Sequence, residues 1–274
     1  MENRPIRRDR RRTEDDGREA AGIVLEQFHL AFLEVATTRL PLEQFALKGG
    51  ANLRFFLRSV RRSVDMDFNF LGDPERSWAF AERVDKIFSS NALGILLRAR
   101  DLSIEKRKPK QTDTTRRWRF NLSAPGVDSV PSKIEFSARP EDRHPDDYEL
   151  ASVDADVARR VQGRPVRLNH YRALAAIAQK IGALRLRNET QPRDVFDLDH
   201  LFREYPDALG KVEVSAAEIR AAKDRALALR YDEYASTVVP YLQEEIVELY
   251  GTAGAWSDMQ LRVAERLEWK EAHR

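Results

Sequence analysis

The sequence predicts an α+β protein, in which an N-terminal mixed β-sheet with flanking helices is followed by a C-terminal helical bundle. Apolar and polar residues alternate strictly from Val64 to Phe70, which is typical of a half-buried strand. Apolar stripes at helical spacing lie on both sides of this segment. After Tyr171 the strand patterns disappear and only helical ones remain. We therefore expect a sheet-containing domain over residues 19–170 and a helical domain over residues 171–274.

Residues 1–18 are expected to form a separate N-terminal arm. They alternate arginines with acidic residues and offer almost nothing apolar to bury, which is typical of a disordered or loosely docked segment. Such an arm is either a solvated tail or a nucleic-acid-binding arm.

The elements of the two domains follow from periodicity. We expect a helix over 20–38, a strand over 45–47, a short helix over 51–57, the strand over 64–70, a helix over 78–87, and strands over 93–105, 116–122 and 132–137. The basic run 106–110 is expected at a hairpin tip or loop, and the acidic stretch 141–149 as an exposed connection. Further helices are expected over 174–184, over 195–202 and from 214 onward, with a kink or break at Pro240.

The composition excludes several classes of protein. Subtracting 45 acidic residues from 47 basic ones leaves a net charge of +2, so any affinity for nucleic acid must come from local patches. The absence of cysteine excludes a disulfide scaffold, a thiolate nucleophile and a cysteine-ligated metal site. No apolar run approaches the roughly 20 residues that span a bilayer, and the N-terminus lacks the apolar region of a signal peptide. We therefore expect a cytoplasmic protein without a membrane partner.

The alternating strand carries two carboxylates on one face. Because side chains two residues apart share a face, Asp65 and Asp67 point together, whereas Met66 and Phe68 are buried on the other side. Two carboxylates this close repel each other, and one pKa rises unless a cation lies between them. Hard divalent cations such as Mg²⁺ bind carboxylate oxygens in this arrangement. The pair therefore indicates a metal site.

A glycine pair precedes this strand. At Gly49-Gly50 the backbone has no Cβ atoms and can approach a phosphate closely, and the helix that follows presents free N–H groups to it. A glycine turn, a short helix and a two-carboxylate strand, in this order, indicate phosphoryl-transfer chemistry. Glu135 lies between the apolar Ile134 and Phe136, so it faces away from the core. If its strand neighbours Asp65 and Asp67, Glu135 is a third metal ligand, and the three carboxylates could hold two ions.

These motifs resemble a known family. Residues 47–54 and 62–68 are similar to the opening motif of the AbiEii nucleotidyltransferase toxins, which include the mycobacterial MenT toxins and belong to the DNA-polymerase-β-like nucleotidyltransferase superfamily. Residues 178–198 resemble the helical block of the family, in which a lysine, here Lys180, precedes an Arg-Asp-x-x-Asp-Leu segment that contains Asp194.

The resemblance implies a nucleotidyltransferase-like N-terminal domain and Mg²⁺-dependent transfer of a nucleoside monophosphate from an NTP. Some members of the family modify the 3′ end of tRNA and so block translation, and such toxins are encoded with a cognate antitoxin. Carried over by position, the resemblance assigns catalysis to Asp65, Asp67, Lys180 and Asp194, and nucleotide binding to Lys48, Gly49, Gly50, Arg62 and Ser63. Ser63 matches a serine at which modification could inactivate the enzyme. The family often has threonine where this chain has Ala51, so the phosphate contacts differ in detail.

Physical reasoning leaves the roles of the helical-domain residues open. Lys180 either reaches the cleft and neutralises the triphosphate, or is a solvated helix residue. Asp194 lies near a helix start, so it is either catalytic or the N-cap of that helix. Arg187 and Arg193 are otherwise expected to pair with nearby acids.

Two basic clusters could contact RNA. Residues 98–119 contain nine basic and three acidic residues, which leaves +6, with Trp118 and Phe120 interleaved. A second cluster of arginines lies just before Asp65. The candidates for RNA contact are Arg58, Arg61, Lys106, Arg107, Lys108 and Arg117. The alternative is an exposed hairpin whose basic residues protect an edge strand.

The sequence thus favours a toxin-like nucleotidyltransferase that acts on RNA, expected to be the 3′ end of tRNA. Two alternatives remain open, namely a nucleotidyltransferase with a protein or small-molecule acceptor, and a non-catalytic RNA-binding module.

Overall fold

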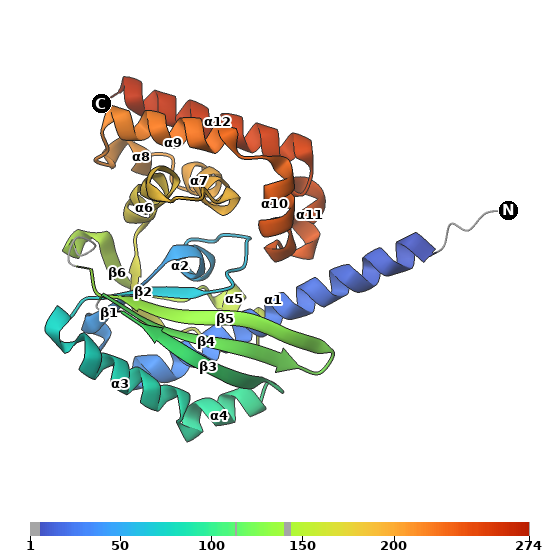
Figure 1. The fold of residues 1–274 in the computed structure, drawn as a ribbon, viewed down its shortest axis with the longest axis vertical. Coiled ribbons are helices and arrows are strands. Elements are labelled where there is room, and N and C mark those ends of the chain that lie inside the picture. The colour runs from blue at the N-terminus through green and yellow to red at the C-terminus, as the bar shows by residue number, and fades with distance from the viewer. Residues whose placement is uncertain (1–5, 113, 140–143, 274) are drawn as a thin grey trace.

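A seven-stranded mixed sheet organises the N-terminal part of the protein (Figure 1). The computed structural model describes residues 6–112, 114–139 and 144–273. The strand order is β3-β4-β5-β2-β1-β7-β6. The strands are β1 (Phe45–Lys48), β2 (Met66–Phe70), β3 (Ser103–Gln111), β4 (Thr115–Ala124), β5 (Val127–Ser137), β6 (Tyr148–Ser152) and β7 (Arg167–Tyr171). β2 pairs with β5 in parallel and with β1 in antiparallel orientation, which confirms the predicted mixed sheet.

Helices cover one face of the sheet and enclose the largest apolar core among the described residues. The helices of this part are α1 (Ile6–Arg39), α2 (Gly49–Phe56), α3 (Ser77–Phe88), α4 (Asn91–Arg98) and α5 (Ala155–Arg160). α1, α3 and α4 lie along the same side of the strands (Figure 1). Phe32 of α1 packs against Phe68 of β2, which in turn stacks on Phe136 of β5 with ring centroids 4.5 Å apart. The apolar half of the alternating strand is therefore buried, as its period predicts.

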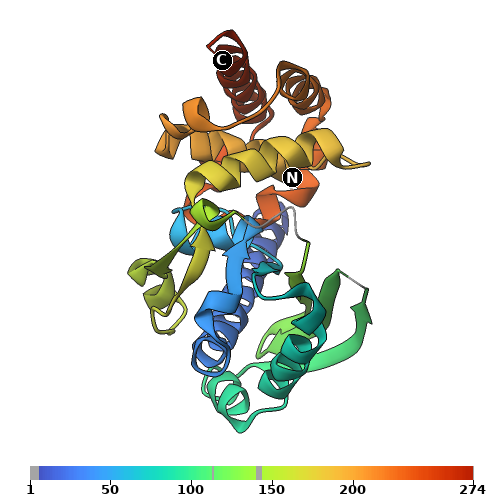
Figure 2. The ribbon, with the colours of Figure 1, turned by 90° about the vertical axis from the view of Figure 1, so that its left-hand side faces the viewer.

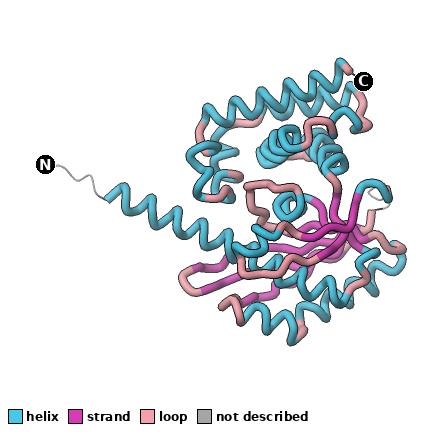
Figure 3. The backbone as a smooth tube through the Cα atoms, turned by 180° about the vertical axis from the view of Figure 1, so that it is seen from behind, coloured by secondary structure: helices cyan, strands magenta, loops and turns pink. Residues whose placement is uncertain are grey.

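A helical bundle follows the last strand and stacks on the other side of the sheet domain (Figure 2). It consists of α6 (Ala173–Leu186), α7 (Pro192–Glu204), α8 (Ala208–Lys211), α9 (Ala216–Ala228), α10 (Tyr231–Thr237), α11 (Glu244–Tyr250) and α12 (Ala253–Ala272). Leu53 and Leu57, from α2 and its C-cap, enter the bundle core, whereas Ala51 and Phe55 of α2 enter the sheet core. α2 therefore lies between the two parts, which Figure 3 shows as separate groups of helices on either side of the strands.

The N-terminal arm differs from its prediction. From Ile6 onward the chain is helical and continuous with the buried part of α1, and this first stretch projects away from the body (Figure 1). Once a helix is nucleated by packing, each further residue adds a hydrogen bond, so the helix continues through a segment whose sequence is almost entirely polar. Residues 1–5 lie outside the described residues, as do residues 141–143 of the predicted acidic connection.

Three further predictions of local structure are wrong. The strand predicted over 93–105 is a strand only from Ser103 onward, and its first part belongs to α4, because Ser90 caps that helix and Leu93 and Leu97 share one buried face. The basic run 106–110 continues β3 instead of forming a hairpin tip, because it pairs with β4 as an edge strand. β6 begins at Tyr148, inside the exposed connection predicted over 141–149, and it pairs with β7, which no sequence pattern indicated.

One segment within α1 has the length and apolar composition of a membrane span. It covers Gly17–Arg39, and 67% of its most apolar window is buried inside the protein. Its apolar residues, Phe28 and Phe32 among them, form the core beneath the sheet. Core helices of this kind satisfy the same criteria as membrane spans, so this segment is weak evidence for a membrane location.

Candidate active site

Three carboxylates meet on the face of the sheet opposite the aromatic core. Asp65 directly precedes β2 and Asp67 lies within it, and both are half-buried. In the parallel pairing of β2 with β5, Asp67 lies directly opposite Glu135. Side chains opposite each other on neighbouring strands lie on the same face, so the register brings the third predicted carboxylate to the first two.

A lysine that the sequence patterns did not indicate lies between these carboxylates. The Nζ atom of Lys133 is 3.0 Å from Asp67 Oδ1, 3.3 Å from Asp65 Oδ2 and 3.7 Å from Glu135 Oε2. Lys133 and Glu135 are two residues apart on β5 and therefore share a face, which is the signal that could have found it. A protein cation thus neutralises the repulsion that the paired carboxylates imply.

The electrostatics of the cluster follow from partial burial. Burial raises the pKa of the Asp65 carboxyl, and Asp67 adds to this effect, while Lys133 and Arg193 oppose it. Burial alone lowers the pKa of the Lys133 ammonium, but the carboxylates of Asp67, Asp65 and Glu135 hold it above its ordinary value. Lys133 is therefore positively charged at neutral pH.

The glycine pair forms the first turn of α2 and lies directly against this cluster. Gly49 has a φ of +71°, in the region that favours glycine, and a Cβ atom there would lie 3.2 Å from Asp67 Oδ2. A Cβ atom on Gly50 would lie 2.7 Å from the Ser63 hydroxyl oxygen, which is tighter than real contacts. The Ser63 hydroxyl donates a hydrogen bond to the carbonyl oxygen of Asp65 at 2.8 Å. The amino end of α2, Ser63 and the carboxylates are thus adjacent, and Lys48 is the strand partner of Asp67.

A buried ion cluster from the bundle reaches the same loop. Arg61 donates from Nε and Nη2 to the two oxygens of Asp197, at 3.0 Å each. Lys180 Nζ lies 2.5 Å from Asp197 and 2.8 Å from Asp194, and Arg187 lies 3.0 Å from Asp194. A Cβ atom on Gly50 would lie 2.9 Å from Arg61 Nη2, so this cluster adjoins the glycine turn. The cluster contains the cations Arg61, Lys180 and Arg187. Its carboxylates are Asp194 and Asp197, so the cluster carries one excess positive charge.

These contacts exclude the non-catalytic alternative for each of Lys180 and Asp194, and the catalytic roles of both residues stay predictions. Lys180 is buried and paired, so it is not a solvated helix residue. Asp194 is not the N-cap of α7, because that position belongs to Gln191 and no side chain caps the helix. Asp197 and Arg61 are the members of this cluster that the sequence patterns did not place in it. The two residues are 136 positions apart in the chain, so no local pattern connects them.

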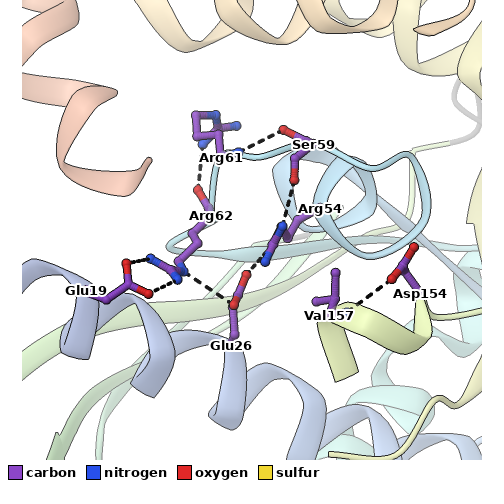
Figure 4. A network of polar contacts seen from close by, with 8 residues as sticks. All are labelled: Glu19, Glu26, Arg54, Ser59, Arg61, Arg62, Asp154 and Val157. Carbon is purple, nitrogen blue, oxygen red and sulfur yellow. Dashed lines mark hydrogen bonds and ion pairs between the residues drawn. The ribbon is translucent and has the colours of Figure 1, made fainter. Parts of the chain in front are cut away.

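Arg62 points toward Glu19 and Glu26 of α1 (Figure 4). Its guanidinium donates to both oxygens of Glu19, at 2.7 and 2.5 Å, and lies 3.5 Å from Glu26. Arg54 also bonds Glu26, so α1 neutralises both arginines. The cluster of arginines before Asp65 is therefore mostly internal. Arg61, predicted to contact RNA, is buried as well, whereas Arg58 is exposed.

The basic segment on β3 and β4 divides between two faces of the sheet. Arg117 pairs with Glu135 across the strands at 2.6 Å, and Arg119 is the strand partner of Lys133. Arg107 is the strand partner of Arg119, so these arginines continue the face that carries the carboxylates. Lys106 instead bonds Asp85 of α3 on the opposite face. The side chain of Lys108 lies outside the described residues.

The donor set fits a hard divalent cation. Within the part of the chain that the structure describes, no group of three or more histidine or acidic side chains is arranged to hold a metal by itself. Mg²⁺, however, is usually bound by one or two carboxylates that leave room for substrate phosphates and water. Asp65 and Asp67 are two half-buried carboxylates beside a glycine turn, so they match this pattern of Mg²⁺ binding.

Comparisons with known proteins identify the family of the chain. A family model described as the nucleotidyl transferase AbiEii toxin of type IV toxin–antitoxin systems matches residues 32–268. No curated protein matches the sequence. The fold is similar to that of JHP933 from Helicobacter pylori (18% identity, 92% of this chain and 95% of that chain covered, TM-score 0.54). It is also similar to MenT4, a nucleotidyltransferase toxin from Mycobacterium tuberculosis (15% identity, 92% and 85% covered, TM-score 0.56). The predicted resemblance is confirmed: the chain belongs to the AbiEii family of nucleotidyltransferase toxins of type IV toxin–antitoxin systems.

Proposed function

We propose that this nucleotidyltransferase uses Mg²⁺ to transfer a nucleoside monophosphate from an NTP to RNA, at the 3′ end of tRNA, and thereby blocks translation in the cytoplasm. The observation that carries the proposal is the contact between the glycine turn and the carboxylates. It joins a phosphate-binding helix end to a cation-binding pair, with the backbone of Gly49 against the carboxylate of Asp67.

Each part of the site has a role in this reaction. Asp65 and Asp67 would hold the metal, which when bound lowers the pKa of the attacking hydroxyl and offsets charge on the leaving group. The N–H groups of Gly49 and Gly50 at the start of α2 bind the triphosphate. The acceptor hydroxyl oxygen forms a bond to the α-phosphorus, the bond from that phosphorus to the pyrophosphate oxygen breaks, and the hydroxyl proton passes to solvent.

The buried cluster of the bundle positions these groups. Arg61 is held by Asp197, and its guanidinium lies beside Gly50, where it adds positive charge near the triphosphate. Lys180 is shared between Asp194 and Asp197, so it joins α6 to α7, and Arg61 joins α7 to the loop that carries Ser63. Catalytic roles for Lys180 and Asp194 would require them to exchange these partners when substrate binds.

Arginines on the face of β3 and β4 that continues the carboxylate face, called here the open sheet face, support RNA as the acceptor. Arg107 and Arg119 are exposed, adjacent across β3 and β4, and continuous with the face that carries Asp67. A row of cations that leads to the reacting groups attracts a polyanion and orients it toward them. Membership of a toxin–antitoxin family implies a cognate antitoxin as the protein partner.

Labelling of acceptors tests the proposal. Wild-type protein is incubated with Mg²⁺, each α-labelled NTP in turn and total tRNA, and we expect RNase-sensitive label on tRNA that is lost in Asp67→Asn. The matched control is Asp128→Asn, an exposed acid on the same strand as Glu135 and about 23 Å along it, which leaves labelling unchanged. Label that survives RNase would identify a protein or small-molecule acceptor instead. RNA binding without any NTP turnover would contradict the proposal.

A further inference from the structure

The ammonium of Lys133 occupies the space between the carboxylates that the proposed function gives to a metal. Its distances of 3.0 Å to Asp67 and 3.3 Å to Asp65 are those of direct ion pairs. All three acids contact Nζ, with Glu135 the farthest at 3.7 Å, and within the described residues they do not form a group of three that could hold a metal ion. A metal and this ammonium cannot occupy the same position.

We propose that Lys133 is an internal counter-ion that competes with the divalent metal at Asp65 and Asp67. It holds the site together while metal is absent and withdraws when metal binds. The proposal rests on the proposed function, which places the metal at these two residues. It adds that the affinity for metal is set by the cost of displacing a protein cation.

The partners of Glu135 indicate which carboxylates are released. Glu135 has a second cation, Arg117, at 2.6 Å, which is closer than Lys133 at 3.7 Å. When Lys133 leaves, Glu135 therefore remains neutralised. Asp65 and Asp67 instead lose the ammonium that bridges them, so another cation must take its place.

The backbone of Lys133 keeps the site ordered during this exchange. Its N–H donates to Asp65 Oδ1 at 3.2 Å, so β5 orients the carboxylate whether or not the side chain is present. The side chain itself is 28% exposed and is a compact charge on a flexible stem. It can therefore move while the strand stays in place.

The displaced ammonium of Lys133 would join two arginines on the same face of the sheet. Lys133 lies opposite Arg119 on β4 and diagonally next to Arg117. An ammonium that leaves the carboxylates adds a further cation to this face, where a triphosphate or an RNA phosphate would neutralise it. Metal binding would thus create positive charge for the substrate at the moment that the site becomes competent.

Metal titration of the full-length protein without nucleotide tests this inference. Free Mn²⁺ is followed by electron paramagnetic resonance for wild type, Lys133→Met, Lys133→Arg and the control Lys106→Met. Lys106 is a partly exposed lysine that pairs with a single acid on the opposite face of the sheet. We expect Lys133→Met to bind Mn²⁺ at least about fivefold more tightly than wild type. Lys133→Arg, which retains the charge, and Lys106→Met should show no tightening.

Thermal unfolding gives a second readout that does not depend on activity. In EDTA, Lys133→Met should unfold at a lower temperature than wild type, because no cation then offsets the repulsion between its carboxylates. Mg²⁺ should raise the unfolding temperature of Lys133→Met by more than that of wild type. Lys133→Gln serves the same comparison if the methionine variant does not fold. A dissociation constant equal to or weaker than that of wild type would overturn the proposal.

The outcomes separate this inference from the proposed function. If Mn²⁺ binds wild type and Lys133→Met equally, and Asp67→Asn abolishes both, the metal site stands and the role of Lys133 is refuted. If neither protein binds Mn²⁺, or if Asp67→Asn has no effect on binding, the metal assignment itself fails.

Discussion

Arg61 and Asp197 form an ion pair with two hydrogen bonds of 3.0 Å that joins the loop before β2 to helix α7. Both side chains are buried. Burial alone raises the pKa of the Asp197 carboxyl, but Arg61 and Lys180 together lower it below its ordinary value. The pair therefore stays charged and fixes the glycine turn and its neighbours against the bundle.

Removing one member of this pair should destabilise the protein strongly. In Arg61→Met the carboxylate of Asp197 loses two of its hydrogen bonds in a buried site, which costs about 3–5 kcal/mol of unfolding free energy. Urea unfolding at neutral pH measures this loss. The control Lys223→Met removes an exposed pair with Glu268 and should leave the unfolding midpoint nearly unchanged. Equal effects of the two variants would refute the structural role of Arg61.

The buried imidazole of His29 predicts a loss of stability in mild acid. Burial lowers the pKa of His29 from 6.5 to about 3. Because the Ser132 hydroxyl donates its proton to the Val64 carbonyl, the His29 Nε2 group donates to Ser132, which the neutral ring can do. Between these two pH values His29 is protonated in the unfolded chain but not in the folded protein. Its contribution to the free energy of unfolding is therefore complete above pH 6.5 and is lost as the pH falls toward 3.

Urea unfolding at pH 7 and pH 5.5 tests this sign. Wild type should lose about 1 kcal/mol more unfolding free energy than His29→Gln over this interval. His144→Gln, at an exposed histidine, should follow wild type. A wild-type curve parallel to that of His29→Gln would contradict the assignment.

A side chain on Gly50 should impair catalysis without unfolding the protein. Its Cβ atom would lie 2.7 Å from the Ser63 hydroxyl and 2.9 Å from Arg61 Nη2, so both groups must shift. Displacement of the site by about 1 Å lowers kcat/KM by about a hundredfold. The matched control is Gly182→Ala in α6, where a Cβ atom meets nothing within 4 Å and should stabilise the helix slightly. Steady-state kinetics and circular dichroism distinguish the two effects.

The open sheet face predicts a salt-dependent contribution to RNA affinity. Arg107→Gln combined with Arg119→Gln should weaken tRNA binding, and the slope of log K against log salt should fall by about one for each RNA phosphate that the variant no longer binds. Lys106→Gln, on the opposite face, should leave the slope unchanged. Filter binding at several salt concentrations measures both, and identical slopes in all variants would rule out this surface.

The sequence predicts the parts of the site that depend on short-range pattern. The alternation from Val64 to Phe70 predicts that Asp65 and Asp67 share a face, and the same period places Glu135 away from the core. The predicted α+β class is confirmed for the same reason, because its strongest elements carry clear periods.

Long-range pairing limits what the sequence predicts. Lys133 meets Asp67 only because β2 and β5 pair in one register across 66 residues. Arg62 adjoins the carboxylates in the sequence, yet Glu19, 43 residues earlier, neutralises it. The short strands β6 and β7 also depend on pairing with each other and with β1, so local pattern gives little sign of them.

A crystal structure of the protein with Mn²⁺ and a non-hydrolysable NTP tests the central claim most directly. We predict an anomalous density peak bonded to oxygens of both Asp65 and Asp67, with the triphosphate against the N–H groups of Gly49 and Gly50. A peak elsewhere, or a triphosphate bound away from the start of α2, would contradict the account.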